Sequence, residues 1–376
     1  MKILHTSDLH IGKRVNEFSM IEEQAHFLSE LLVAVITELP DALIIAGDVY
    51  DKPVPSAEAV MLFDRFLKRL AELSVPTFII SGNHDSPERL GFASDLICES
   101  GIHIHGVYEG RLGQFTLSDE LGPVNFYTLP FIKPTHARHY FPEADIDSYT
   151  DAIRAALEGY PKCEGERNIL ITHQFVTGAD RTESEEKSVG GTDNVDAEVF
   201  SRFDYVALGH IHRSQRAGGE NIRYSGSPIK YSFSEVNDKK SITVVELFEK
   251  GNISYREIEL TPTTDMAEIR GEYNEVISKS FYEGTEFQDA YLRVTLTDEN
   301  DIPDAISRLR TVYKNIMILQ YDNARTRHAT EIGVAEGVEE KSPLELFTEL
   351  FSAQNGRDMS EQELACITKY IEEVWE

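Results

Sequence analysis

Short apolar runs that end in a polar side chain dominate the hydrophobic pattern of the N-terminal part of the chain. The clearest is Leu43–Ala46, which is apolar at every position, as expected of a central strand covered on both faces. Gly47 then permits a sharp turn, and Asp48 follows at the carboxyl end of the predicted strand. Open α/β sheets bind ligands at that end. A single apolar run that ends in Gly-Asp more often leads into an ordinary turn. It indicates a metal site only if the same pattern occurs again along the chain.

The same pattern of a strand followed by a potential metal ligand occurs four more times. Apolar runs begin at Lys2, Val75, Arg167 and Asp204, and each ends next to aspartate, asparagine or histidine. The resulting candidates are Asp8, His10, Asp48, Asn83, His173, His210 and His212. A second histidine pair, in Ile102–His105, follows a predicted helix and lies inside a strand. We therefore interpret that pair as part of an ordinary strand face.

Helical periodicity separates the first three runs. Phe18–Leu39, Ser56–Leu73 and Arg89–Glu99 each repeat apolar residues at helical spacing, which with the strands predicts the order βαβαβ and a mostly parallel core. Further along, Thr150–Glu158 is predicted to be helical. Gly178–Val195 is polar and acidic without periodicity, and we expect a mobile loop there.

Composition changes near Thr261-Pro262, where a second, smaller part of the chain begins. Its pattern predicts a strand, a helix and a strand at Asp289–Thr297, Ile302–Tyr313 and Ile316–Tyr321, then two amphipathic helices at Pro343–Ser352 and Ser360–Trp375. Ser360 and Glu363 match a capping box. We expect a large domain over 1–262, a small module over 263–325, a linker over 326–341 and a helical tail over 342–376.

Composition limits the class of protein. The 376 residues are 41% hydrophobic and 27% charged, as in ordinary globular proteins. No apolar run approaches the roughly 18 residues that span a bilayer, and three scattered cysteines predict a reducing cytoplasm. The net charge of −29 argues against coating nucleic acid through a basic surface. Bound divalent cations could still supply positive charge where phosphates approach.

The candidate ligands suit a particular chemistry. Two aspartates, one asparagine and four histidines could hold two cations about 3.5–4 Å apart, an arrangement used for phosphoester hydrolysis. Mixed oxygen and nitrogen donors favour manganese, iron or zinc over magnesium alone.

The motifs D-x-H, G-D-x-x-D, G-N-H-D, a lone histidine after a strand and G-H-x-H occur here in the order found in the calcineurin-like metallophosphoesterases. The chain resembles one branch in particular, the SbcD family of nuclease subunits in bacterial MRN-type complexes. The stretches that carry this resemblance are T-S-D-L-H-I-G-K, A-G-D-V-Y-D, S-G-N-H-D-S-P and L-G-H-I-H. That resemblance implies an α/β fold, a two-sheet sandwich flanked by helices, with a small βαβ-type cap and a C-terminal helical hairpin.

The resemblance also implies roles for individual residues. One metal, most simply manganese, would be held by Asp8, His10, Asp48 and His212. The other would be held by Asp48, Asn83, His173 and His210, with Asp48 shared. His84 matches the family's catalytic histidine, and Asp51 matches the carboxylate that orients it.

By the same resemblance, the chain would be a manganese-dependent DNA nuclease, a 3′–5′ exonuclease and a hairpin or end endonuclease. It would be a homodimer whose C-terminal helices bind the SbcC ATPase, since the chain has no G-x-x-x-x-G-K-[ST] motif of its own. Two alternatives stay open: a phosphodiesterase acting on a small nucleotide, and a vestigial site in a chain that only organises SbcC.

Overall fold

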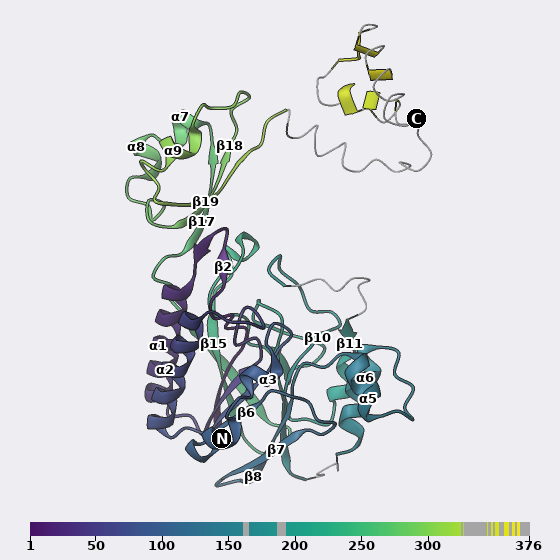
Figure 1. Ribbon diagram of the computed structural model, residues 1–376. Helices are drawn as coiled ribbons and strands as arrows, with labels where there is room; N and C mark the ends of the chain where they lie inside the picture. Colours follow the sequence, from purple (N-terminus) through teal and green to yellow (C-terminus); the bar gives the residue numbers. More distant parts are fainter. Residues whose placement is uncertain are drawn as a thin grey trace. The chain divides into compact units, whose positions relative to one another are not determined.

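The computed structural model describes residues 1–160, 165–185 and 193–324, with isolated positions between 326 and 368. It divides into two units, Met1–Met266 and Ala267–Glu376. In the first unit, two six-stranded sheets pack face to face (Figure 1). Within the described ranges, no helix is both long and apolar enough to cross a membrane.

The first sheet has the order β16-β15-β1-β4-β5-β6. Its central strands run parallel, as the βαβαβ pattern predicted, and the hairpin β15–β16 adds an antiparallel edge beside β1. The strands are β1 (Lys2–Thr6), β4 (Ala42–Ala46), β5 (Thr77–Ile80), β6 (Ile102–His105), β15 (Ser241–Leu247) and β16 (Ile253–Glu259).

The second sheet has the order β13-β14-β12-β9-β8-β7. Strands β8, β9, β12 and β14 are parallel, and the outer strands β7 and β13 are antiparallel to their neighbours. The strands are β7 (Gly113–Asp119), β8 (Gly122–Leu129), β9 (Arg167–His173), β12 (Tyr205–Gly209), β13 (Gln215–Arg216) and β14 (Ile222–Tyr224).

Helices cover both outer faces of the sandwich. Helices α1 (Ile21–Glu38) and α2 (Ala57–Leu73) lie together on one flank, and α5 (Pro134–Tyr140) and α6 (Tyr149–Glu158) lie together on the other (Figure 1). Between the sheets, apolar side chains from both form one buried core that includes Ile44, Phe78, Phe126, Ile169 and Tyr205. This layering confirms the α/β sandwich predicted from the sequence.

Two local predictions were wrong, and one helix was missed. The helix expected over Arg89–Glu99 is broken into α3 (Pro87–Leu90), α4 (Ser94–Ile97) and a 3-10 turn, because Ala93 adopts a φ of 60°, outside the helical region. Helix α1 begins three residues later than predicted, after a small hairpin of β2 (Arg14–Val15) and β3 (Phe18–Ser19). Helix α5 was not predicted.

The second unit is a three-stranded sheet with short helices. Parallel strands β18 (Tyr291–Leu296) and β19 (Asn315–Tyr321) are joined through α9 (Ala305–Leu309), which confirms the βαβ pattern. The other elements are β17 (Met266–Gly271), α7 (Tyr273–Val276) and α8 (Lys279–Tyr282). Apart from Thr326, the predicted linker lies outside the described residues, as do four positions of the first tail helix and most of the second. The capping box is present, since Glu363 accepts from the Ser360 amide at 2.8 Å.

One buried carboxylate ties together the loops that follow β4 and β5. Asp85 accepts backbone hydrogen bonds from Val49 at 3.1 Å, Tyr50 at 2.8 Å and Gly82 at 3.0 Å. It is only 5% exposed. The carboxylate therefore satisfies three amides in two loops, one carrying Asp48 and the other Asn83.

We expect Asp85→Ala to lower the free energy of unfolding by roughly 3 kcal/mol, because it leaves three amides without their acceptor. Chemical denaturation in the presence of a chelator measures this without a contribution from metal binding. The exposed Asp95→Ala is the matched control and should change stability little. Equal stability of the two variants would contradict the proposed clamp.

Candidate metal centre

All the predicted ligands lie at the carboxyl ends of five strands, three from one sheet and two from the other. Asp8 and His10 follow β1, Asp48 follows β4, and Asn83 follows β5. His173 ends β9, and His210 and His212 follow β12. Asp8, His10, Asp48 and His210 all adopt positive φ, which is uncommon for residues other than glycine and is concentrated at functional sites.

Asp48 lies between two groups of donor atoms. Its Oδ2 is 3.7 Å from Nε2 of His10 and 3.4 Å from Nε2 of His173. Donor atoms lie within 4.8 Å of one another in three overlapping sets: Asp8, His10 and His212; His10, Asp48 and His84; and Asp8, Asp48 and His173. These sets place Asp8, His10, Asp48, His173 and His212 together, with Asp8, His10 and Asp48 each in two sets, and they also include His84.

Several donor atoms point at one another in a way that a shared cation would explain. Nε2 of His10 and Nε2 of His212 are 3.0 Å apart. The side-chain oxygen of Asn83 faces Nε2 of His173 at 3.0 Å and Nδ1 of His210 at 2.9 Å. Buried Nδ1 of His10 and Nε2 of His210 have no hydrogen-bond partner among the described residues. This convergence of imidazole and oxygen donors fits divalent metal ions.

Glycines make this convergence sterically possible. A Cβ on Gly47, where φ is +89°, would overlap the His173 ring, and a Cβ on Gly209 would overlap the carbonyl oxygen of Ala46. That carbonyl in turn contacts Nδ1 of His173 at 2.8 Å. Because Nδ1 donates to the carbonyl, Nε2 is the nitrogen of His173 that faces Asp48 and Asn83.

The charges at the centre are strongly coupled. Burial by itself would raise the pKa of Asp48, but the neighbouring His173 outweighs burial and holds that pKa well below its usual range. Burial likewise opposes protonation of His173, yet Asp48 raises its pKa to about 9. For His210, burial and the adjacent His173 lower the pKa to about 3. In the absence of metal, one buried proton on His173 therefore faces the Asp48 carboxylate.

His84 is placed beside the ligands. Its ring meets that of His10 edge to face, with centroids 4.7 Å apart, and its amide donates to Asp48 Oδ1 at 2.9 Å. Its Nδ1 lies 3.0 Å from the backbone carbonyl of Asp51. The carboxylate of Asp51, expected to orient His84, accepts from Lys13 Nζ at 2.7 Å and lies 3.8 Å from His10 Nδ1. Asp51 thus contacts His84 through its main chain.

Sequence reasoning missed a polar group around His212. Ser184 and Glu185, from the segment predicted to be mobile, both contact this histidine, and the segment's end forms β11 (Asn194–Val195) beside β10 (Phe175–Val176). The described part of this loop thus makes specific contacts with the centre, which its sequence did not indicate. Glu235 and Lys240 complete the group. None follows an apolar strand, so no periodic signal could have indicated them. Asp85, in contrast, is the last residue of the G-N-H-D motif, which was a signal in the sequence for this residue.

The second histidine pair is separate from the centre. His103 stacks on Phe78 and meets Phe115 at a tilt, and Nδ1 of His105 lies 2.8 Å from the Thr128 hydroxyl. These contacts agree with the interpretation of an ordinary strand face.

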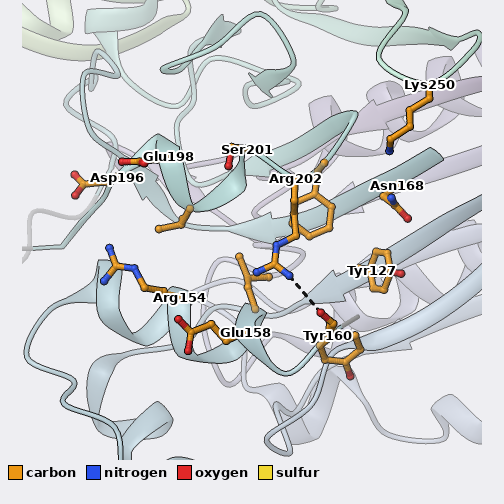
Figure 2. A pocket seen from close by; sticks show the side chains of 13 residues that line it. Tyr127, Arg154, Glu158, Tyr160, Asn168, Asp196, Glu198, Ser201, Arg202 and Lys250 are labelled. Carbon is orange, nitrogen blue, oxygen red and sulfur yellow. Dashed lines mark hydrogen bonds between the residues drawn. The ribbon is translucent and has the colours of Figure 1, made fainter. Parts of the chain in front are cut away.

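A cavity of about 670 Å³ lies elsewhere in the same unit, lined by α6 and by residues at the start of β9 and before β12. Figure 2 shows its lining, where Arg202 donates to the Tyr160 carbonyl at 3.4 Å. None of the candidate ligands, all of which are described, lines this cavity.

Comparison with known proteins agrees with this geometry. The calcineurin-like phosphoesterase family matches residues 1–214, and the family described as the type 5 capsule protein repressor C-terminal domain, SbcD_C, matches residues 262–355. A Staphylococcus epidermidis protein, named as the SbcD subunit of nuclease SbcCD, is 34% identical over 325 residues, 85% of each chain.

Solved structures resemble the chain more distantly. A dimetal phosphatase from Danio rerio is 13% identical, with a TM-score of 0.39, over 68% of this chain and 95% of its own. The protein TT1561 of Thermus thermophilus is 14% identical, with a TM-score of 0.39, over 68% of this chain and 98% of its own. On the sequence matches and the fold, the chain belongs to the calcineurin-like phosphoesterases, in the SbcD family of SbcCD nuclease subunits.

Proposed function

We propose that this chain is a manganese-dependent DNA nuclease subunit that hydrolyses phosphodiester bonds with two divalent cations. It would act as a 3′–5′ exonuclease on double-strand ends and as an endonuclease on hairpins and single strands, in DNA repair, recombination and replication. The observation that carries the proposal is the Asp48 carboxylate, which lies between two buried sets of donors. The relative's name, a nuclease subunit, supports DNA as the substrate.

The residues present would divide between two ions. Asp8, His10, Asp48 and His212 would hold one, and Asp48, Asn83, His173 and His210 the other. When bound, two such ions acidify a water molecule and stabilise charge on the phosphate. Ser7 and the His210 amide both donate hydrogen bonds to the Asp8 carboxylate, which keeps that carboxylate oriented toward the centre.

His84 would protonate the oxygen that leaves the phosphorus. Because Nδ1 of His84 donates to the Asp51 carbonyl, Nε2 is the nitrogen that exchanges a proton with the substrate. The ring is partly exposed, whereas the candidate ligands among the histidines are buried, so solvent and substrate can reach it. Asp51 acts here by its main chain on His84 and by its carboxylate on Lys13 and His10.

Partners would bind through the rest of the chain. Residues 263–325 would form a DNA-binding cap, and residues 342–376 would form the helical tail that binds the SbcC ATPase. The relative's assignment to an SbcCD complex supports this partner. Two copies of each subunit would give a heterotetramer, located in the cytoplasm at the nucleoid.

A second function, a phosphodiesterase on a small nucleotide, uses the same centre. Incubating the protein with manganese and a blunt-ended duplex, alone and with SbcC plus ATP, distinguishes the two. We expect progressive shortening of the duplex that increases with SbcC and ATP. Hydrolysis of cyclic nucleotides without any cleavage of DNA would favour the small substrate.

We expect His84→Ala to retain both metal ions while the cleavage rate falls by about 100-fold or more, since a proton donor is lost and the ligands are kept. Calorimetric titration with manganese and cleavage of a labelled duplex measure the two quantities. If the variant instead lost an ion, His84 would be a ligand, which its distance to His10 and Asp48 permits.

We expect Asp48→Asn and Asp8→Asn both to be nearly inactive but to differ in metal content. Asp48→Asn removes charge from both ions, whereas Asp8→Asn affects one directly, and each ~1.4 kcal/mol is tenfold in rate. After dialysis, metal analysis should find close to one ion per chain in Asp8→Asn and less in Asp48→Asn. The same metal content in both variants would show that Asp48 is not shared.

We expect manganese affinity to rise with pH between about pH 6.5 and 8.5. The pKa of His173 without metal is raised to about 9, so a proton occupies this ligand at lower pH and must leave when the ion binds. Titration calorimetry in two buffers with different ionisation enthalpies counts the released protons. An affinity that does not vary over this range would contradict the assignment of His173.

A further inference from the structure

His212 is linked to a fully buried carboxylate through one serine. Nδ1 of His212 lies 2.7 Å from Oγ of Ser184, and that hydroxyl donates to Oε1 of Glu235 at 2.6 Å. Glu235 has no exposed surface, and its other oxygen accepts from Nζ of Lys240 at 2.5 Å. Lys240 also donates to the backbone carbonyl of His212 at 2.9 Å.

In the series His212–Ser184–Glu235, chemistry determines which group donates each hydrogen bond. Glu235 forms a buried ion pair with Lys240, whose Nζ lies 2.5 Å from Oε2, so the carboxylate is ionised. An ionised carboxylate can only accept, and Ser184 has a single hydroxyl hydrogen, which it gives to Glu235. Ser184 must therefore accept from His212, whose hydrogen lies on Nδ1. The lone pair of Nε2 is then directed to the centre, 3.0 Å from His10 Nε2.

The segment that supplies Ser184 contacts His212 directly and is linked to His210 through the Phe175 ring. Glu185 Oε1 accepts from the His212 amide at 2.7 Å. At the other end, the Arg181 guanidinium lies over the Phe175 ring at 3.6 Å, and that ring is 6.3 Å from His210. Arg181 is also paired with Asp193 at 2.7 Å. The segment is thus held to the ligand loop by side chains rather than by a regular backbone ladder.

We propose that Ser184 and Glu235 are positioning residues for His212, which fix its Nδ1–H tautomer so that Nε2 can bind a metal ion. The proposal rests on the two-metal function proposed above. One consequence is reciprocal: an ion on His212 and the ordered segment Thr182–Glu185 stabilise each other, because both depend on the same imidazole.

Titration of the metal-free full-length protein with manganese tests the relay. In Ser184→Ala we expect one of the two ions to bind about 10- to 100-fold more weakly and the other to change little. Ser184→Thr keeps a hydroxyl and should restore binding. Ser148→Ala is the matched control, since Ser148 caps α6 through its own hydrogen bonds with Asp151 and contacts no candidate ligand.

A spectroscopic readout separates positioning from a merely structural role. In the zinc-loaded, ¹⁵N-histidine-labelled protein, His212 should give a slowly exchanging Nδ1–H signal, assigned by its loss in His212→Gln. In Ser184→Ala this signal should exchange faster with water, while Ser148→Ala leaves it unchanged.

Each outcome bears on one proposal or on both. One outcome is that the wild-type protein binds two ions while Ser184→Ala binds both equally tightly and keeps the Nδ1–H signal. That result would overturn the relay but not the proposed function. Equal weakening of both ions in Ser184→Ala and in Ser148→Ala would also overturn it, by indicating a general loss of stability. A wild-type protein that binds no metal would remove the basis of both.

Discussion

The contact on which this centre depends is the hydrogen bond from His173 of one sheet to the Ala46 carbonyl of the other. It joins the carboxyl ends of β9 and β4, one from each layer. Gly47 and Gly209 permit that approach, since any side chain at either position would overlap the ring or the carbonyl. Donors from β1, β4, β5, β9 and β12 can therefore surround one small volume, although they are far apart in the sequence.

Burial determines how the side chains at the centre are protonated. Carboxylates and imidazoles placed out of water interact strongly, so their pKa values separate in opposite directions, with His173 near 9 and His210 near 3. Such a cluster is costly without compensating charge, and divalent cations supply it. The same cations allow a chain of net charge −29 to approach a phosphodiester.

Support for the ligands comes from residues that do not touch the metals themselves. Asp85 holds the loops of Asp48 and Asn83 through backbone amides, and the Ser184–Glu235 relay orients His212 through its ring. Loops carry the ligands, yet each loop is fixed by buried polar bonds. This explains how residues at strained positive φ keep a defined geometry.

The sequence by itself indicated the strands that carry the candidate ligands, the parallel core and the candidate ligands, because an apolar run ending in a polar residue is a local signal. It could not determine that Asp51 meets His84 through a carbonyl, or that Ser184 and Glu235 support His212, since those contacts join polar loops with no periodic pattern. The broken helix near Ala93 could not be predicted for a different reason. The apolar residues there keep a helical spacing, and only the backbone angle of one residue interrupts the helix. Which donor atoms lie within reach of one another was decided only by the packing of one sheet on the other, because the donors come from strands far apart in the sequence.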